Sequence, residues 1–516
     1  MQRLKSIPEN YSATLWMGLL CALSAVLYGL ASPRLNWHFL CWVLLIPLLE
    51  ALHGLRLRRG FFTGWLCGAM IHLVCFYWVI GTIQRYSNLN LSLSILVWIL
   101  FAAYSGLAFG LMTTLFVFLA KGSSIPKIIL LPVCYTTMEF AFPFVFPWHL
   151  GAGLYRVPSI IQISDLFGVY GVTALIVAVN AALWELSRFL RRKMAFPWLS
   201  LATATGLIAA SLLYGFWRIT YVEQQQEGAP DLEVGVVQAN VRIEERRSPM
   251  LRDDIWRRYR RLSHEAVQRG AELIVWPESA VHFPYRPNSA KHTASGFLRE
   301  FVRTLQRPLL FGSWAVEKSG PRNRAYLLGP NGEFVDQYDK VQLLAFGEYM
   351  PFSDWIPQIK GLVQGVGDFR PGERIEPLCW DDFCFGVLIC FEAILKPISR
   401  EFTNQGAQFL VNITNDAWFG DTSCPEQHLM LAAFRAVENR VWLVRSANTG
   451  ISAFVDPVGR IIHRAAYLEQ AVRVCRIDLM EISSVYRKWG DWFAFSCSVF
   501  LGLLVAIKLV RERRSS

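Results

Sequence analysis

The chain has 516 residues, of which 53% are hydrophobic and 18% charged, with 19 Trp and 35 Phe. This composition excludes a disordered chain and is not that of an ordinary soluble enzyme. Residues 1–221 hold fifteen Lys and Arg against five Asp and Glu, whereas residues 222–490 hold 32 against 33. Because the basic excess interrupts hydrophobic runs, it is typical of a membrane protein and not of a nucleic-acid-binding protein.

Eight apolar segments are long enough to cross a membrane as helices, which takes roughly 17 to 25 residues. We place them near residues 13–31, 37–55, 61–82, 92–119, 127–147, 158–187, 197–217 and 492–510. The sequence therefore predicts a polytopic α-helical membrane domain over residues 1–221, and a last transmembrane helix with a basic tail over residues 491–516. Glu139 and Asp165 lie inside or beside interrupted segments, where each either faces a polar partner or marks a helix end.

The basic residues between these segments predict the orientation of the chain. Alternate loops and the two ends carry fifteen Lys and Arg, and the other loops carry only Arg34, Arg85, Arg156 and Arg218. Because Lys and Arg are enriched on the cytoplasmic side, both termini are expected in the cytoplasm and residues 222–490 outside the inner membrane. No cleavage site follows the first segment, so we interpret it as a retained helix.

After a polar linker near residue 223, residues 222–490 show short apolar runs that alternate with helical patterns. Six runs predict buried strands: 232–240, 272–279, 308–316, 383–390, 408–415 and 441–448. Four stretches predict helices: 249–269, 294–305, 394–405 and 425–439. This alternation predicts an exported α/β sandwich domain.

Three ionisable residues stand at the edges of apolar sequence in this domain. Cys390 ends the strand in FGVLIC, Glu278 follows the strand in WPES, and Lys340 precedes FGEYMPF, which contains Glu348. Alone, the cysteine is an inert buried residue and each charge a solvated one. Together they supply a nucleophile, a base and a cation, and the two charged groups are expected to favour the thiolate.

The other cysteines carry less information. No CxxC pair or His spacing is typical of zinc, so we expect no metal site. Cys379 and Cys384 flank a predicted turn between two strands. They either form a disulfide in an oxidising compartment or remain two unpaired thiols on neighbouring strands.

Several motifs resemble known families. WPES, DKVQLLAFGEYMPF and ICFE resemble the Glu, Lys and Cys motifs of the nitrilase superfamily. NITNDAWFG and RAVENRVWLVRSANTGISAFVDPVGR resemble its membrane branch, the apolipoprotein N-acyltransferase family, over nearly the whole chain. The resemblance implies an αββα sandwich in which Glu278 is the general base, Lys340 stabilises the oxyanion and Cys390 is the nucleophile. It also implies supporting roles for Glu348, Glu392 and the backbone N–H near Phe391.

The same resemblance implies the activity. Cys390 would take an acyl chain from a membrane phospholipid as a thioester and pass it to the α-amine of diacylglyceryl-cysteine in an apolipoprotein. It implies no cofactor and no nucleic acid, and we expect a monomer in the bacterial inner membrane with a periplasmic catalytic domain. One departure concerns the loop after the first strand, where the family's Trp is missing and Arg247 stands nearby.

Two other functions compete with this one. A nitrilase-type amidase or hydrolase acting on a small amide or ester would use the same three residues, but it would not need eight transmembrane segments. A catalytically silent membrane scaffold would tolerate the loss of all three.

A segment over residues 353–372 is unusually apolar for an exported loop. We interpret this segment, which includes Trp355 and Leu362, as a lid at the bilayer surface. The alternative is a loop that packs into the core of the domain. Trp418, in NITNDAWFG, is a further candidate substrate contact.

Overall fold

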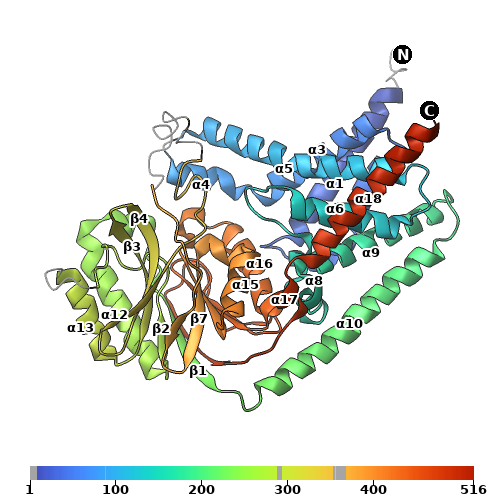
Figure 1. Ribbon diagram of the computed structural model, residues 1–516. Coiled ribbons are helices and arrows are strands. Elements are labelled where there is room, and N and C mark those ends of the chain that lie inside the picture. The colour runs from blue at the N-terminus through green and yellow to red at the C-terminus, as the bar shows by residue number, and fades with distance from the viewer. Residues whose placement is uncertain (1–8, 88, 288–292, 352–354, 356–367, 516) are drawn as a thin grey trace. The chain divides into compact units, whose positions relative to one another are not determined.

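The computed structural model describes residues 9–87, 89–287, 293–351, 355 and 368–515. The chain divides into two compact units (Figure 1). Unit 1 comprises residues 1–80, 91–216 and 491–516, and unit 2 comprises residues 81–90 and 217–490.

Unit 1 is built from helices. Their bounds are α1 (Glu9–Ala31), η1 (His38–Trp42), α2 (Ile46–Leu52), α3 (Leu57–Cys75), α5 (Leu91–Ala120), α6 (Lys127–Ala141), η2 (Leu150–Leu154), α7 (Pro158–Ile161), α8 (Ser164–Phe167), α9 (Val169–Leu190), α10 (Trp198–Gln226) and α18 (Trp492–Ser515). The short helix α4 (Trp78–Tyr86) follows α3, and the ends of α4 and α10 belong to unit 2.

Within the described residues, five helices are long and apolar enough to cross a membrane: α1, α5, α9, α10 and α18. A sixth span results if α3 and α4, bent by 63°, are taken together. The predicted count of about eight is not confirmed. Segment 37–55 divides into η1 and α2, α6 ends just before Pro143, and segment 158–187 breaks at Gly168. Proline disfavours a helical residue before it, and Gly168 has a φ of +66°.

Both carboxylates in unit 1 have polar partners. The side chain of Glu139 accepts hydrogen bonds from the Leu150 N–H at 2.7 Å and the Thr173 hydroxyl at 3.0 Å. Asp165 accepts one from the Tyr214 hydroxyl at 2.7 Å. Glu139 and Asp165 are both buried. They therefore face polar partners inside the unit and do not simply mark helix ends.

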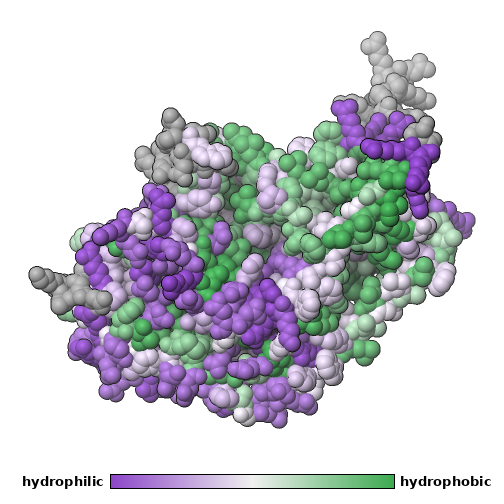
Figure 2. Space-filling model, viewed as in Figure 1, coloured by the Kyte–Doolittle hydropathy of each residue, from purple (hydrophilic) through white to green (hydrophobic). Residues whose placement is uncertain are grey.

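The surface of unit 1 is apolar where a membrane would contact it. On α18, Phe495 is 61% exposed and Leu503 is 58% exposed. Figure 2 shows this region as hydrophobic, with hydrophilic atoms at the end of the helix. Large apolar side chains in contact with water are unfavourable, so this surface suits a hydrocarbon environment.

Unit 2 contains two six-stranded sheets. The first has the order β12-β1-β2-β3-β4-β5 and the second β11-β10-β9-β8-β7-β6. The bounds are β1 (Asp231–Gln238), β2 (Leu273–Val275), β3 (Leu309–Glu317), β4 (Gly320–Leu328), β5 (Phe334–Asp339), β6 (Leu378–Trp380), β7 (Phe383–Ile389), β8 (Phe409–Thr414), β9 (Trp442–Ala447), β10 (Ala453–Val455), β11 (Ile461–Ile462) and β12 (Ala471–Asp478). Strands β1, β2 and β3 are parallel neighbours, as are β7, β8 and β9.

Helices cover the outer faces of the two sheets (Figure 1). On the first sheet, α12 (Arg252–Gln268) and α13 (Thr293–Leu305) pack through residues such as Leu262 and Phe301. On the second, α15 (Lys396–Asn404) and α16 (Cys424–Asn439) pack through residues such as Phe402. Side chains of both sheets form one buried core between them. The predicted αββα sandwich is confirmed.

All six predicted strands are present, as β1, β2, β3, β7, β8 and β9, and the four predicted helices are α12, α13, α15 and α16. Strands β4, β5, β10, β11 and β12 were not predicted, because most are short or carry many polar residues, whereas β6 is the first strand of the predicted turn between Cys379 and Cys384. The polar residues 223–226, predicted as a linker, instead extend α10 to Gln226. Cys379 and Cys384 face each other across β6 and β7 and form a disulfide.

Candidate active site

The three predicted catalytic residues follow strand ends. Glu278 lies three residues after β2, Lys340 comes directly after β5, and Cys390 directly after β7. The charges of Glu278 and Lys340 both act on the Cys390 thiol, so the fold brings the three groups together from distant parts of the sequence. Sites in α/β folds commonly form at the carboxyl ends of strands in this way.

Glu278 is a buried carboxylate with two fixed hydrogen-bond donors. Its Oε1 accepts from Asn323 Nδ2 at 2.8 Å, and its Oε2 accepts from the Asn415 N–H at 3.0 Å. Burial raises the pKa of Glu278 above its ordinary value, and the charge of Lys340 opposes this rise. A carboxylate with a raised pKa is a stronger base than an exposed one, which suits it to take a proton.

Lys340 is almost completely buried and pairs with Glu348. Its Nζ lies 2.7 Å from Glu348 Oε2, and Asn323 Nδ2 donates to Glu348 Oε1 at 2.8 Å, so one amide contacts both acids. Burial alone would lower the pKa of Lys340, but Glu348, Cys390 and Glu278 together raise it above its usual value. Lys340 is therefore a permanent cation held in place, as the stabilisation of an oxyanion requires.

Cys390 occupies the turn between β7 and η4 (Cys390–Ile394). Its φ of +53° lies in the left-handed region, which costs a residue other than glycine on the order of 1 kcal/mol or more. Burial, followed by the charge of Glu278, raises the pKa of the thiol, and Lys340 opposes this only in part. The expected resting thiolate is therefore not supported. The raised pKa favours the thiol over the thiolate, so a base is needed to take the proton as the sulfur attacks.

Glu392 connects the segments that carry Lys340 and Cys390. Four groups donate to its carboxylate: Tyr338 OH at 3.0 Å, Val341 N at 2.8 Å, Gln342 N at 3.1 Å and Ile389 N at 2.8 Å. Burial raises the pKa of Glu392 to about 7, with Lys340 and the three backbone donors acting in the opposite direction. Glu392 thus ties the segment that carries Lys340 to the segment that carries Cys390.

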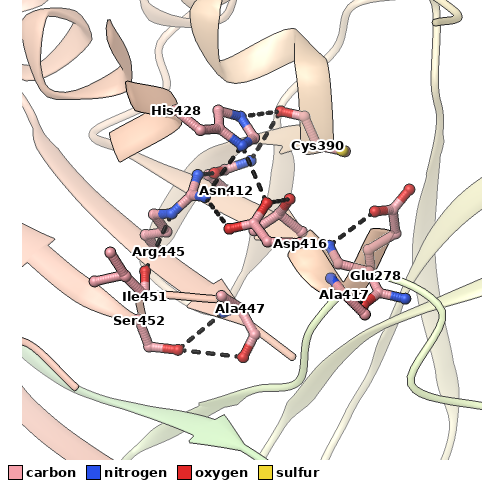
Figure 3. A network of polar contacts seen from close by, with 12 residues as sticks. Glu278, Cys390, Asn412, Asp416, Ala417, His428, Arg445, Ala447, Ile451 and Ser452 are labelled. Carbon is pink, nitrogen blue, oxygen red and sulfur yellow. Dashed lines mark hydrogen bonds and ion pairs between the residues drawn. The ribbon is translucent and has the colours of Figure 1, made fainter. Parts of the chain in front are cut away.

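A buried polar cluster holds the carbonyl group of Cys390 (Figure 3). His428 Nε2 lies 3.0 Å from the Cys390 oxygen, so Nε2 must carry the proton. His428 Nδ1 lies 3.2 Å from both Arg445 Nη2 and Asp416 Oδ1, and Arg445 Nη2 also donates to Asp416 Oδ2 at 2.8 Å. Burial and then the charge of Arg445 lower the pKa of His428, which is consistent with a neutral ring. In Figure 3 the Cys390 sulfur points away from this contact.

We expect His428→Leu to slow acylation of Cys390 on the order of 10²-fold, because a small displacement of a reacting atom has that effect. His428→Gln can still donate to the carbonyl and should recover much of the rate. Asn439→Ala is the matched control, since Asn439 is buried on the same helix and bonds Ser399 and the Arg435 carbonyl. Single-turnover rates and melting temperatures are measured together. Equal slowing in Asn439→Ala at equal loss of stability would contradict a positioning role.

The segment 81–90 was not predicted to join the catalytic unit. Tyr86 stacks on Trp418 with ring centroids 4.3 Å apart, and Arg85 Nη1 donates to the Trp418 carbonyl at 3.4 Å. Tyr86 is also close enough to Cys390 and Glu278 to interact with their charges. Trp418 lies in η5 (Asp416–Phe419), directly after the Asn415 that binds Glu278. No local sequence pattern indicates this contact, because the partners are more than 300 residues apart.

The short helix α11 (Ile243–Arg247), which follows β1, contributes a cation to the site. Arg247 is exposed, whereas the charge of its half-buried neighbour Arg246 acts on Glu278 and Tyr86. Of the predicted lid, Trp355 is 83% exposed, and Leu362 lies outside the described residues. The lid therefore stays a prediction. The described residues contain no group of three or more His, Cys, Asp or Glu that could hold a metal ion.

A Glu, a Lys and a Cys at strand ends of an αββα sandwich define a nitrilase-type domain. The carbon-nitrogen hydrolase family model matches residues 233–487, and the model of the apolipoprotein N-acyltransferase N-terminal domain matches residues 24–182. The chain belongs to the apolipoprotein N-acyltransferase family.

Similar proteins include two apolipoprotein N-acyltransferases. The one from Geobacter metallireducens is 34% identical, over 96% of this chain and 95% of that protein. The one from Bdellovibrio bacteriovorus is 29% identical, over 89% of this chain and 88% of that protein. Among solved structures, an amidase from Nesterenkonia sp. is 22% identical, over 50% of this chain and 92% of that chain, with a TM-score of 0.37.

Proposed function

We propose that this chain transfers an acyl chain from a membrane phospholipid to the N-terminal α-amine of diacylglyceryl-cysteine in apolipoproteins, through a thioester on Cys390. The observation that carries the proposal is the joint burial of a base, a fixed cation and a thiol in a domain whose chain continues into apolar helices. Membership of the apolipoprotein N-acyltransferase family supports the choice of substrates.

In the first half-reaction, Glu278 takes the proton of the Cys390 thiol as the sulfur attacks the ester carbonyl carbon. The oxyanion forms beside the Lys340 ammonium and the backbone N–H near Phe391. The bond between the carbonyl carbon and the ester oxygen then breaks, and Glu278 returns the proton to that oxygen. A lysophospholipid leaves, and the acyl chain remains on Cys390 as a thioester.

In the second half-reaction, the α-amine of the lipoprotein attacks the thioester carbon. Glu278 removes a proton from the amine nitrogen, Lys340 again stabilises the oxyanion, and the bond from carbon to sulfur breaks. The proton returns to the sulfur, so the thiol is regenerated and an amide is formed.

A hydrolase would use the same residues but would replace the amine with water. The two functions are separated by incubating the purified full-length protein with phosphatidylethanolamine and a diacylglyceryl-cysteine peptide. The proposal predicts N-acylated peptide and little free fatty acid. A peptide of the same sequence with an acetylated α-amine is the control and should not accept the chain. Free fatty acid as the main product with the unblocked peptide would favour a hydrolase.

We expect Lys340→Met to reduce the rate of acyl-enzyme formation by about 10² to 10³, the effect of removing one oxyanion-stabilising group. Methionine keeps much of the buried volume, so the change removes the charge with little loss of packing. Lys318→Met, at an exposed position of unit 2, is the control. Single-turnover acylation and lipid binding are measured separately. An unchanged acylation rate in Lys340→Met would contradict the oxyanion role.

We also propose that both termini are cytoplasmic and that the catalytic domain is periplasmic. The start of α1 and the end of α18 lie at the same end of unit 1, which supports a common side for the termini (Figure 1). A phosphatase fused after Gly228, in an exposed turn, should be active because export activates the reporter. A fusion after Gly122, in the turn between α5 and α6, should be inactive. An inactive fusion after Gly228 and an active fusion after Gly122 would show that the orientation is the reverse of the proposed one.

A further inference from the structure

Unit 1 contains a cavity of about 910 Å³ that the proposed reaction does not use. It lies where α5, α9 and α18 end and where α3 and α6 begin, between the α2–α3 and α5–α6 connections. Its volume falls within the range of small-molecule sites. All its lining residues belong to unit 1, whereas Glu278, Lys340 and Cys390 belong to unit 2, so it is a separate site.

The charge of the cavity lining is strongly positive. Five cations and one carboxylate line it: Arg56, Arg58, Lys121, Lys127, Lys508 and Glu512. Cations this close together repel one another, and the field they create attracts an anion. The lining therefore selects for negative charge.

Two of these cations already have partners in the protein. Lys508 Nζ donates to the carbonyl of Lys121 at 2.6 Å and to the carbonyl of Phe118, so it binds the end of α5. Lys127 Nζ lies 3.5 Å from Glu185 Oε1 and 5.4 Å from the centroid of the Trp184 ring. These two residues hold the walls of the cavity together.

The other three basic side chains are available for a ligand. In the part of the chain that the structure describes, Arg56, Arg58 and Lys121 make no ion pair and no side-chain hydrogen bond. Arg56 and Arg58 come from the connection between α2 and α3, and Lys121 comes directly after α5. Charged groups from two separate connections thus converge on one cavity. Arginine in particular matches the oxygens of a phosphate group.

Apolar side chains form the rest of the lining. Leu52 and Phe116 are buried in the wall, and Leu57 lines the cavity while remaining 44% exposed. The lining therefore continues onto the apolar outer surface of unit 1. A free inorganic anion would gain nothing from this surface, whereas a lipid would place its acyl chains there.

We propose that this cavity binds an anionic membrane phospholipid, with the phosphate beside Arg56, Arg58 and Lys121 and the acyl chains along Leu57. The lipid ties the α2–α3 connection to the end of α5. Basic pockets between membrane helices bind anionic headgroups by the same physical means. This inference does not depend on the chemistry of Cys390.

The test uses phosphatidylglycerol with a photoactivatable headgroup, reconstituted with the full-length protein and followed by peptide mapping. Cross-links are expected within residues 49–58 and 116–127. Arg56→Gln/Arg58→Gln/Lys121→Gln should reduce them about 100-fold at limiting lipid, since each basic residue contributes roughly a fivefold factor. The matched control, Arg59→Gln/Arg511→Gln/Arg514→Gln, removes the same charge from exposed positions outside the lining and should cross-link normally. Arg56→Lys/Arg58→Lys keeps the charge and should retain most cross-linking.

Several results would overturn the proposal. Equal cross-linking of the triple Gln variant and its control would exclude recognition by these cations. Equal labelling by a phosphatidylcholine probe would exclude selection for negative charge. Complete displacement by excess inorganic phosphate would show a site for a soluble anion. Acylation of Cys390 is followed in the same samples, so loss of acylation with normal cross-linking would count only against the proposed enzyme activity.

Discussion

Cys390→Ala is expected to abolish acyl-enzyme formation and transfer completely while the protein keeps its melting temperature. The proposed thioester forms on the Cys390 sulfur, and exchange of a buried thiol for a methyl group costs little packing. Cys475→Ala is the matched control, because Cys475 is also a free, buried cysteine of unit 2 but lies on β12. Its activity should equal that of the wild type. Intact-mass analysis after incubation with phospholipid measures acyl-enzyme formation in both variants.

The nucleophile assignment fails if Cys390→Ala still transfers acyl chains at a substantial rate. It fails equally if the thioester is found on another cysteine in the wild type. Loss of activity in both cysteine variants, accompanied by a lower melting temperature, would show that the protein tolerates neither change and that stability explains the result.

Glu278→Gln is expected to reduce both half-reactions by roughly 10² to 10⁴, the usual contribution of a general base. The amide has nearly the same shape as the carboxylate, but it cannot take a proton. Glu426→Gln is the control, because Glu426 is equally buried and its ion pair with Arg464 lies outside the site. Stopped assays of acylation and of transfer to a lipopeptide amine measure the two steps. A slow first step with a normal second step would restrict Glu278 to thiol activation.

The pH dependence of the acylation rate should reflect the ionisation of Glu278. Glu278 acts as a base only when ionised, and burial raises its pKa above the ordinary value of 4.5. The rate should therefore fall on acidification through a pKa higher than 4.5, and remain high above it. Glu278→Gln should lose this acidic limb, leaving a low rate that does not change over the same range. An acidic limb retained in Glu278→Gln would assign it to another group.

The three residues of the candidate site could be located from the sequence because each one lies at the edge of an apolar run. Glu278, Lys340 and Cys390 are visible as ionisable residues at the edges of apolar runs, and their motifs resemble those of a known superfamily. The contacts that support these residues could not be predicted, because they join parts of the chain that are far apart in the sequence. The Asn415 N–H reaches Glu278 across 137 residues, and His428 reaches the Cys390 carbonyl across 38. Such contacts depend on how the two sheets and α16 pack, which no local pattern encodes.

For the membrane helices, the sequence indicates the apolar segments but not the helix boundaries. Hydropathy found the apolar segments, but it does not detect where a helix breaks. Gly168 divides one predicted span, and η1 and α2 replace another. The chain can leave the helical conformation inside an apolar segment when polar partners are available, as the bond from the Leu45 N–H, between η1 and α2, to Asn180 Oδ1 illustrates.

The most direct test of the central claim is a two-step intact-mass experiment on the wild-type protein. Incubation with phosphatidylethanolamine alone should raise the mass by one fatty acid less one water, with the added group mapped to Cys390. Addition of a diacylglyceryl-cysteine peptide should then return the protein to its original mass and yield one N-acylated peptide per acyl-enzyme. A protein that never gains the acyl mass, or an acyl-enzyme that water discharges as fast as the peptide does, would contradict the account.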